Sequence, residues 1–166
     1  MRAVALSVAL AIGALAARPH GQAASDASTV TASAIIAGLA KLSLSSLTLT
    51  FPDANPDIVT VIPASGGPLS ISAKARATPG STVTLTVEAL DDLRSGTDVI
   101  PASALTWTGV GAGFANGIVA RGTARTVASW PGSGARNGTQ AYTLQNSWTY
   151  ATGTYTLTLT YTLTAP

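Results

Sequence analysis

Residues 154–164 alternate strictly between two kinds of side chain. Every even-numbered position is Thr, and the odd-numbered positions are Tyr155, Leu157, Leu159, Tyr161 and Leu163. A period of two sorts these sets onto opposite faces of an extended strand, whereas a helix would scatter both sets around its circumference. The segment therefore predicts a long strand, which the turn residues Ala151–Gly153 introduce.

The same alternation recurs through most of the chain and predicts an all-β protein. It is found over residues 30–36, 42–51, 69–77, 83–89, 105–108, 118–120, 126–130 and 141–144. Between these segments lie turn-forming pairs such as Gly66-Gly67, Pro79-Gly80 and Asn137-Gly138. About eight strands with one apolar face each predict a single domain over residues 28–166. Its expected architecture is an antiparallel, immunoglobulin-like β-sandwich.

The first 24 residues have the pattern of a signal peptide. Arg2 gives a positive start, residues 3–17 are mainly apolar, and small residues follow. The apolar run is shorter than the ~20 residues that span a bilayer. We expect a helical leader cleaved near Ala24, with Ala16 as the alternative, and no transmembrane span in the mature chain. The expected location is the cell surface, the surrounding medium or the periplasm.

Cleavage would leave little catalytic chemistry. The chain has no Cys, and its single His, His20, lies in the leader together with Arg2 and Arg18. A Ser-His-Asp triad, a thiolate nucleophile and imidazole metal ligands are then excluded. Because all seven acidic residues remain, the net charge falls from +2 to about zero, and nucleic-acid binding is not expected. We expect no enzyme activity and no cofactor.

Two acidic stretches are candidate sites. Asp53, Asn55 and Asp57 space three oxygen side chains as the start of a calcium loop does, although an Asx turn at Pro56 is the favoured interpretation of these residues. The second stretch, residues 91–98, could hold a carboxylate pair for glycoside hydrolysis. The alternative interpretation of that stretch is a polar loop in which an Asp pairs with Arg94.

Aromatic residues form the third candidate site. A glycan-stacking platform could be built from Trp107, Trp130, Trp148 and Tyr150, since aromatic faces on a sheet can hold sugar rings. Tryptophan in a sandwich also serves as core packing. A further motif, Asn137-Gly138-Thr139, fits a hairpin turn and also matches the N-glycosylation pattern.

Two families of bacterial surface proteins have similar motifs. The Gly153-Thr154-Tyr155 entry into the last strand resembles the closing strand of the spore coat protein U family of fimbria-like subunits. The order of residues 83–87, Asp92-Leu93-Arg94, Trp107 and 158–163 resembles the WxL surface domain, which binds cell walls. Either resemblance implies an exported all-β surface protein.

The chain ends suggest how such a protein could act. Residues 29–36 form an alternating segment at the start of the mature chain, and a long strand ends near the C-terminus. An unpaired strand of this kind accepts or donates a strand between copies. We expect a structural or adhesive protein that associates with itself by strand exchange. The alternative is a module that binds cell-wall polysaccharide or another carbohydrate through its Trp residues.

Overall fold

The computed structural model describes residues 30–166, and residues 35–166 form one unit. The leader predicted over residues 1–24, with its helix, lies outside the described residues. Residues 30–38 carry no strand, and all of their side chains are exposed. The first strand begins at Leu39.

The unit contains eleven strands and one short 3-10 helix among the described residues, which confirms the predicted all-β fold. Seven of the strands have six residues or more, close to the predicted number, and the other four have two or three. The elements are β1 (Leu39–Leu44), β2 (Val61–Pro63), β3 (Leu69–Arg76), β4 (Thr82–Ala89), β5 (Leu93–Ser95), β6 (Asp98–Ile100), η1 (Ala102–Ala104), β7 (Leu105–Val110), β8 (Gly117–Ile118), β9 (Arg125–Pro131), β10 (Gly134–Gln145) and β11 (Leu159–Thr164).

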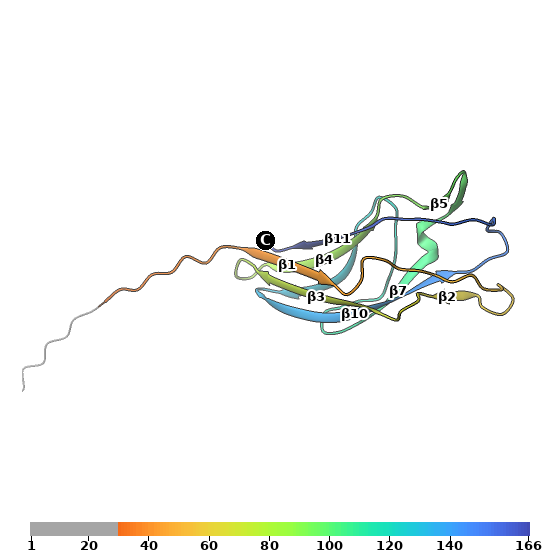
Figure 1. Cartoon of the computed structure of the whole chain (residues 1–166). Coiled ribbons are helices and arrows are strands. Elements are labelled where there is room, and N and C mark those ends of the chain that lie inside the picture. The colour runs from red at the N-terminus through yellow and green to blue at the C-terminus, as the bar shows by residue number, and fades with distance from the viewer. Residues whose placement is uncertain (1–29) are drawn as a thin grey trace, which may run out of the picture. The chain divides into compact units, whose positions relative to one another are not determined.

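Two antiparallel sheets pack face to face (Figure 1). The first sheet has the order β1-β3-β10-β7-β8, and β2 pairs with the far half of β10. The second sheet has the order β11-β4-β9, and β5 and β6 form a separate hairpin. The long strand β10 organises the first sheet because it pairs with β3 on one side and with β7 on the other.

The core lies between the two sheets, where alternate residues of each strand point inward. Val83, Leu85 and Val87 of β4 are completely buried, and Val127 of β9 lies beside them in the second sheet. Ile71 of β3 is 2% exposed and belongs to the facing sheet. Burying an aliphatic side chain of this size stabilises a fold by about 1.5–3 kcal/mol, so the central strands hold the two layers together.

Three sequence predictions about strands are wrong. Residues 30–36 and 47–51 alternate but form no strand, and the C-terminal strand begins at Leu159 rather than at residue 154. Asn137-Gly138 is not a hairpin turn, because both residues lie inside β10. Gly138 instead makes room for an aromatic ring: a Cβ there would lie 2.5 Å from the ring carbons of Phe114.

Both the first and the last strand reach the same end of the sandwich. Leu39 is paired with Arg76 at the end of β3, and the Thr78 N–H donates to the carbonyl of Pro166 at 2.7 Å. The turn after β3 is the predicted Pro79-Gly80 turn, with Gly80 at φ +82°. A φ of this sign is accessible to glycine without steric cost.

Candidate functional site

One side of the sandwich ends in two strands that each have a single partner. β1 pairs only with β3, and β11 pairs only with β4, among the strands of residues 30–166. The two strands lie next to each other (Figure 1). The free sides of β1 and β11 are called the open edge below. Main-chain N–H and C=O groups along such an edge are a template for another strand.

The inward side chains at the open edge are incompletely covered. In the adjacent strand β4 the inward residues are fully buried, but those of the two edge strands are only half buried: Leu42, Leu44, Leu159, Tyr161 and Leu163. Apolar surface left partly in water is stabilised when a further layer covers it. The open edge therefore offers both unpaired backbone and uncovered apolar surface.

The opposite side of the sandwich is closed by the segment between β7 and β8. The Ala115 N–H donates to the carbonyl of Val127 at 2.9 Å, and the Ser129 N–H donates to the carbonyl of Gly113 at 3.0 Å. Residues 111–116 thus cover the free side of β9, and they are called the closed edge below. Phe114 joins the two sheets here, since its backbone bridges Ala128 while its ring lies on Gly138.

The segment before β1 has the alternation that a donated strand needs. Val30 is 92% exposed and Ile36 is 74% exposed, and small residues occupy the two intervening positions of the same phase, Ala32 and Ala34. At about 3.3 Å per residue, seven extended residues would span about 23 Å, and a six-residue edge strand about 20 Å. Residues 30–36 are called the tail below.

A buried polar bridge lies directly behind the open edge. The Tyr161 hydroxyl of β11 donates to Oε1 of Gln140 at 2.6 Å, and it lies 2.6 Å from the Tyr142 hydroxyl. Gln140 and Tyr142 both belong to β10, so the bridge links the two sheets. Burial raises the pKa of Tyr142 to about 12 and raises the pKa of Tyr161 as well. Both phenols therefore stay neutral and keep their donated hydrogen bonds.

The structure separates the four residues predicted to stack on glycans. Trp107 and Trp130 are each only 2% exposed, so the prediction is corrected for these two: they are core residues. The Trp107 Nε1–H donates to the Ala115 carbonyl at 2.9 Å, and the Arg136 guanidinium lies 5.7 Å from the Trp130 ring centroid.

The other two aromatic candidates do not form a platform with these. Trp148 is 69% exposed, but its indole N–H donates a hydrogen bond to the Asp57 carboxylate at 2.9 Å. Tyr150 is half buried against the core margin, and burial raises the pKa of its hydroxyl. One exposed indole therefore remains of the predicted platform.

The calcium candidates are parts of a turn. The Asp57 N–H donates to the Asn55 side-chain oxygen at 2.9 Å, and the Ile58 N–H donates to the Asn55 carbonyl at 3.0 Å. This is the Asx turn that the alternative interpretation predicted. Within residues 30–166, no three His, Cys, Asp or Glu side chains gather as they would around a metal ion.

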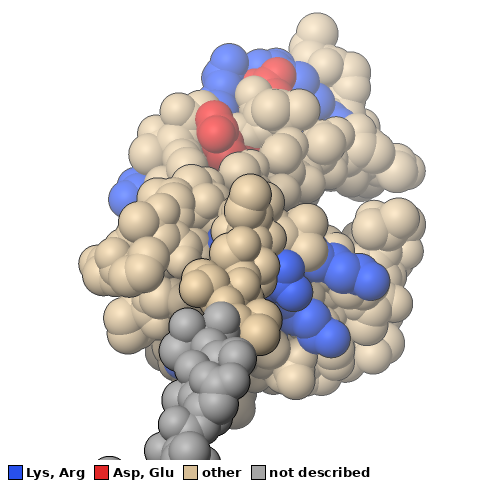
Figure 2. Space-filling model, turned by 90° about the vertical axis from the view of Figure 1, so that its left-hand side faces the viewer, with Lys and Arg blue, Asp and Glu red and all other residues tan. Residues whose placement is uncertain are grey.

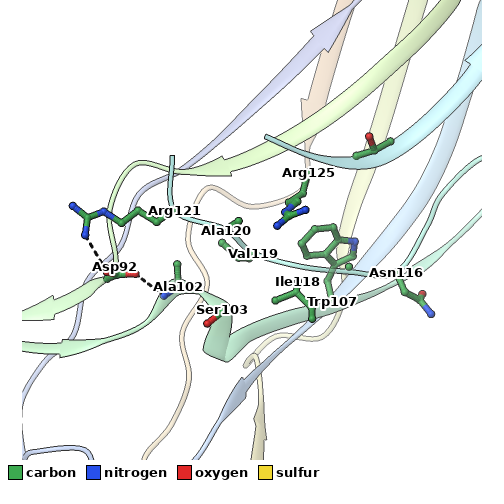
Figure 3. Close-up of a pocket in the computed structure, with 12 residues that line it drawn as sticks. Asp92, Ala102, Ser103, Trp107, Asn116, Ile118, Val119, Ala120, Arg121 and Arg125 are labelled. Atoms are coloured by element: carbon green, nitrogen blue, oxygen red, sulfur yellow. Dashed lines mark hydrogen bonds and ion pairs between the residues drawn. The ribbon is translucent and has the colours of Figure 1, made fainter. Parts of the chain in front are cut away.

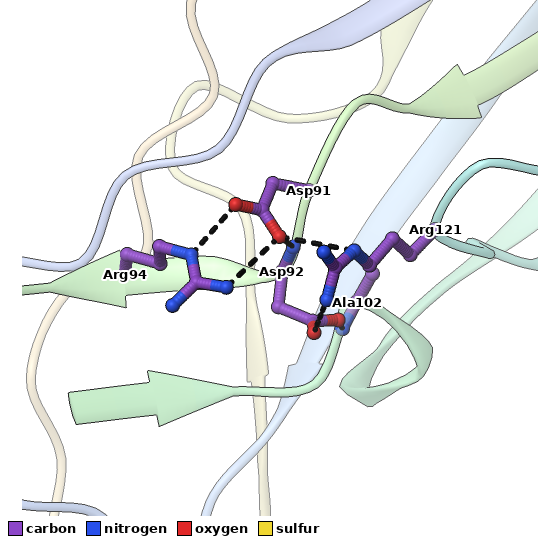
Figure 4. Close-up of polar contacts among 5 residues, drawn as sticks. All are labelled: Asp91, Asp92, Arg94, Ala102 and Arg121. Carbon is purple, nitrogen blue, oxygen red and sulfur yellow. Dashed lines mark hydrogen bonds and ion pairs between the residues drawn. The ribbon is translucent and has the colours of Figure 1, made fainter. Parts of the chain in front are cut away.

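The charged stretch after β4 forms an ion-pair network (Figure 4). The Arg94 guanidinium donates to both oxygens of Asp91, at 2.6 and 3.2 Å, as the polar-loop interpretation predicted. Arg121 pairs with Asp91 at 3.1 Å and with Asp92 at 3.2 Å. The hydrogen bond from Arg94 is the main reason why the pKa of Asp91 falls to about 2. The network joins the start of β5 to the loop before β9.

A cavity of about 570 Å³ lies beside this network (Figure 3). Asp92 is the one carboxylate that lines it. One oxygen of Asp92 accepts from the Ala102 N–H at 2.9 Å and the other accepts from Arg121. Neither Asp91 nor Asp98 lines this cavity. The carboxylate pair considered for residues 91–98 is thus not brought together there.

Sequence reasoning singled out the C-terminal strand as a strand open to other copies, but it missed the edge position of β1 and the polar bridge. Gln140 is buried, and the clue was its phase: residues 138, 140, 142 and 144 are alternate positions of one strand, and Tyr142 and Leu144 are apolar. No local pattern in the sequence tells whether a strand lies at the edge of a sheet, since this depends on which strands pair.

Residues 30–166 contain no helix with the length and hydropathy that a membrane crossing requires. Comparison of the chain with protein-family models, with curated proteins and with solved structures finds no match.

Proposed function

We propose that the protein is an exported structural or adhesive subunit that assembles by strand exchange. In this proposal the tail of one copy pairs with the open edge of another copy. Cell-surface location follows from the predicted leader, and no catalytic step is involved. One observation carries the proposal. The same chain contains both an exposed alternating segment and an incompletely covered edge of the sandwich.

The two parts are chemically complementary. The tail presents Val30 and Ile36 on one phase, and the open edge has half-buried Leu and Tyr side chains. Strand addition would form main-chain hydrogen bonds and cover apolar surface in the same step. The contact joins different parts of two copies, so it is heterologous and can extend into a filament.

The tail also gives a sharply matched test. Two Asp substitutions at its apolar phase, Val30→Asp and Ile36→Asp, should abolish assembly, because a carboxylate cannot be buried in the edge without a partner. Two at its polar phase, Thr31→Asp and Ser33→Asp, add the same charge to the same segment and should leave assembly intact.

Size-exclusion chromatography with light scattering measures the outcome. The proposal predicts oligomers or filaments for the wild-type protein and for the polar-phase variant, and monomer for the apolar-phase variant. A wild-type monomer at every concentration tested would contradict it. The same oligomeric state for the two variants would contradict the claim that the apolar phase of the tail joins the copies.

A further inference from the structure

The outer face of the first sheet carries a regular grid of short polar side chains. The strand register places Ser43, Ser72 and Asn137 in one row across β1, β3 and β10. The next outward row contains Ser70 and Thr139, and Ser45 joins it because the Ser45 hydroxyl accepts from the Ser70 N–H at 2.9 Å. These six short polar side chains lie side by side on three adjacent strands and on the residue that follows β1.

This grid lines a groove of about 520 Å³. The row between the two polar rows is Leu44, Ile71 and Gly138. Ile71 is buried on the other face of the sheet, so this middle row contributes main chain to the groove floor. Short side chains around a backbone floor leave a shallow channel with hydrogen-bonding walls.

Basic residues stand at one end of the groove. The outward row next to Ser43 and Ser72 contains Lys41 and Lys74, which lie directly opposite each other. Arg76 is two residues further along the same face of β3. All three side chains are exposed. Like charges that face each other across two strands are destabilising. An anion bound between Lys41 and Lys74 would relieve this repulsion.

The acidic residues lie elsewhere in the described part of the chain. Asp53 and Asp57 belong to the connection from β1 to β2, and Asp91, Asp92 and Asp98 lie around the β5–β6 hairpin. Glu88 is on β4 in the other sheet. The ion pairs within residues 30–166 involve Arg94 and Arg121 and none of the three basic residues at the groove.

The space-filling view agrees with this separation of charge. Figure 2 shows one group of basic residues with acidic ones among them and a second basic group with no acidic residue beside it. Positive charge without nearby negative charge attracts anions and steers them to the surface.

We infer that this groove binds an acidic polysaccharide. Sugar hydroxyls would exchange hydrogen bonds with the Ser, Thr and Asn side chains, and an acidic group of the polymer would lie between Lys41 and Lys74. An open channel suits an extended polymer better than a small molecule, which pockets enclose. Among residues 30–166, no aromatic side chain lines the groove. This disfavours nucleic acid, because single strands bind by base stacking.

The inference is independent of strand exchange, since the groove lies within one copy. It also differs from the Trp-based site considered from the sequence, because none of the three Trp residues lines it.

Titration calorimetry with polygalacturonate tests the inference, and fully methyl-esterified polygalacturonate serves as the neutral control. The wild-type protein should bind the acidic polymer and not the ester, and binding should weaken with added salt. The double variant Lys41→Gln and Lys74→Gln should weaken binding about tenfold or more, as expected when charge-assisted hydrogen bonds are lost.

Two single variants provide a charge-matched comparison. Lys74→Gln and Arg125→Gln each remove one exposed positive charge, but Lys74 stands at one end of the groove, whereas Arg125 is on β9 in the other sheet. Lys74→Gln should weaken binding severalfold, and Arg125→Gln should change it less than about twofold, as expected for a distant screened charge. Ser72→Phe fills the groove without changing charge and should also weaken binding.

Several results would overturn the inference. These are no binding of polygalacturonate, equal effects of Lys74→Gln and Arg125→Gln, or unchanged binding by a folded Ser72→Phe variant. Equally tight binding of anionic phospholipid vesicles or of a single-stranded oligonucleotide, with the same dependence on Lys41 and Lys74, would also overturn it, because the patch would then attract any polyanion.

Discussion

The two sides of the sandwich differ in how their outer strands end. At the closed edge, residues 111–116 bond to β9 and Phe114 joins both sheets. At the open edge, β1 and β11 have one partner each, and their inward side chains are only half buried. Natural sheets usually cover or disrupt their edges to prevent association. The proposed strand exchange uses the side that is left uncovered.

The polar bridge shows what the open edge has in place of a covering segment. Tyr161 holds β11 to β10 through Gln140 and Tyr142. Gln140 Nε2 has no partner within the described residues, so the bridge is an incompletely satisfied buried network. Such networks fix strand position at a cost in stability. The open edge therefore depends in part on an incompletely satisfied network, and we expect it to be the less stable side.

The largest expected effect comes from two leucines that are paired across the register. Leu85 of β4 is completely buried, and its partner Leu163 of β11 is half buried. Leu85→Ala should lower the free energy of unfolding by about 3–5 kcal/mol, and Leu163→Ala by about 1–2 kcal/mol, because cavity cost follows burial. Each change is made in the apolar-phase tail variant, Val30→Asp with Ile36→Asp, which is expected to be monomeric. Urea denaturation then measures the free energy of unfolding. Equal losses would contradict the difference between the central strand and the edge.

Alkaline pH should loosen the open edge before the closed one. Tyr142 has a pKa of about 12 in the folded protein against an ordinary value of 10.0. Its contribution is therefore fully present below about pH 10 and is lost as the pH rises toward 12, by about 2–3 kcal/mol in total.

Hydrogen exchange followed by mass spectrometry would locate this loss. Exchange rates are first corrected for the faster intrinsic exchange at high pH. Between pH 10 and 12, the protection of backbone amides should then fall first in β11 and later in β9. Tyr142→Phe should remove the part of the pH dependence that comes from Tyr142, while the part that comes from Tyr161, whose pKa burial also raises, should remain. Simultaneous loss of protection in both strands would contradict an independent open edge.

A smaller effect should come from two glycines of β10. A Cβ on Gly138 would lie 2.5 Å from the Phe114 ring, whereas a Cβ on Gly134 would meet its nearest atom at 3.5 Å. Gly138→Ala should cost about 1–3 kcal/mol, because overpacking displaces the ring that closes this side. Gly134→Ala should be close to neutral. Thermal denaturation compares the two variants, and equal melting temperatures would show that Phe114 does not close this edge.

The fold could be predicted from sequence where alternation coincides with burial on one face. β3 and β4 were predicted to within one residue, since their inward positions are uniformly apolar. Residues 30–36 and 47–51 alternate as clearly but form no strand. Alternation reports which side chains share a face, and a strand also needs a partner for its backbone.

The candidate site was less predictable for a related reason. The sequence does not say which face of a strand a Trp occupies, so Trp107 and Trp130 were candidates for a surface that they do not reach. Asn137-Gly138 has the composition of a turn, but the requirement for glycine comes from Phe114, 24 residues away in the chain. Long-range contacts of this kind are absent from local patterns.

The most direct test of the central claim joins the tail of one copy to the open edge of another. Because the chain has no Cys, a Ser33→Cys variant can be mixed with Thr160→Cys, Thr162→Cys or Thr164→Cys, which together cover β11 in any register. A Ser129→Cys variant on β9 is the control at the closed edge. After oxidation, mass spectrometry should find mixed dimers with at least one β11 variant, since a disulfide forms only where Cα atoms lie within about 7 Å. Mixed dimers no more frequent with β11 than with Ser129→Cys would contradict strand exchange at the β11 side of the open edge.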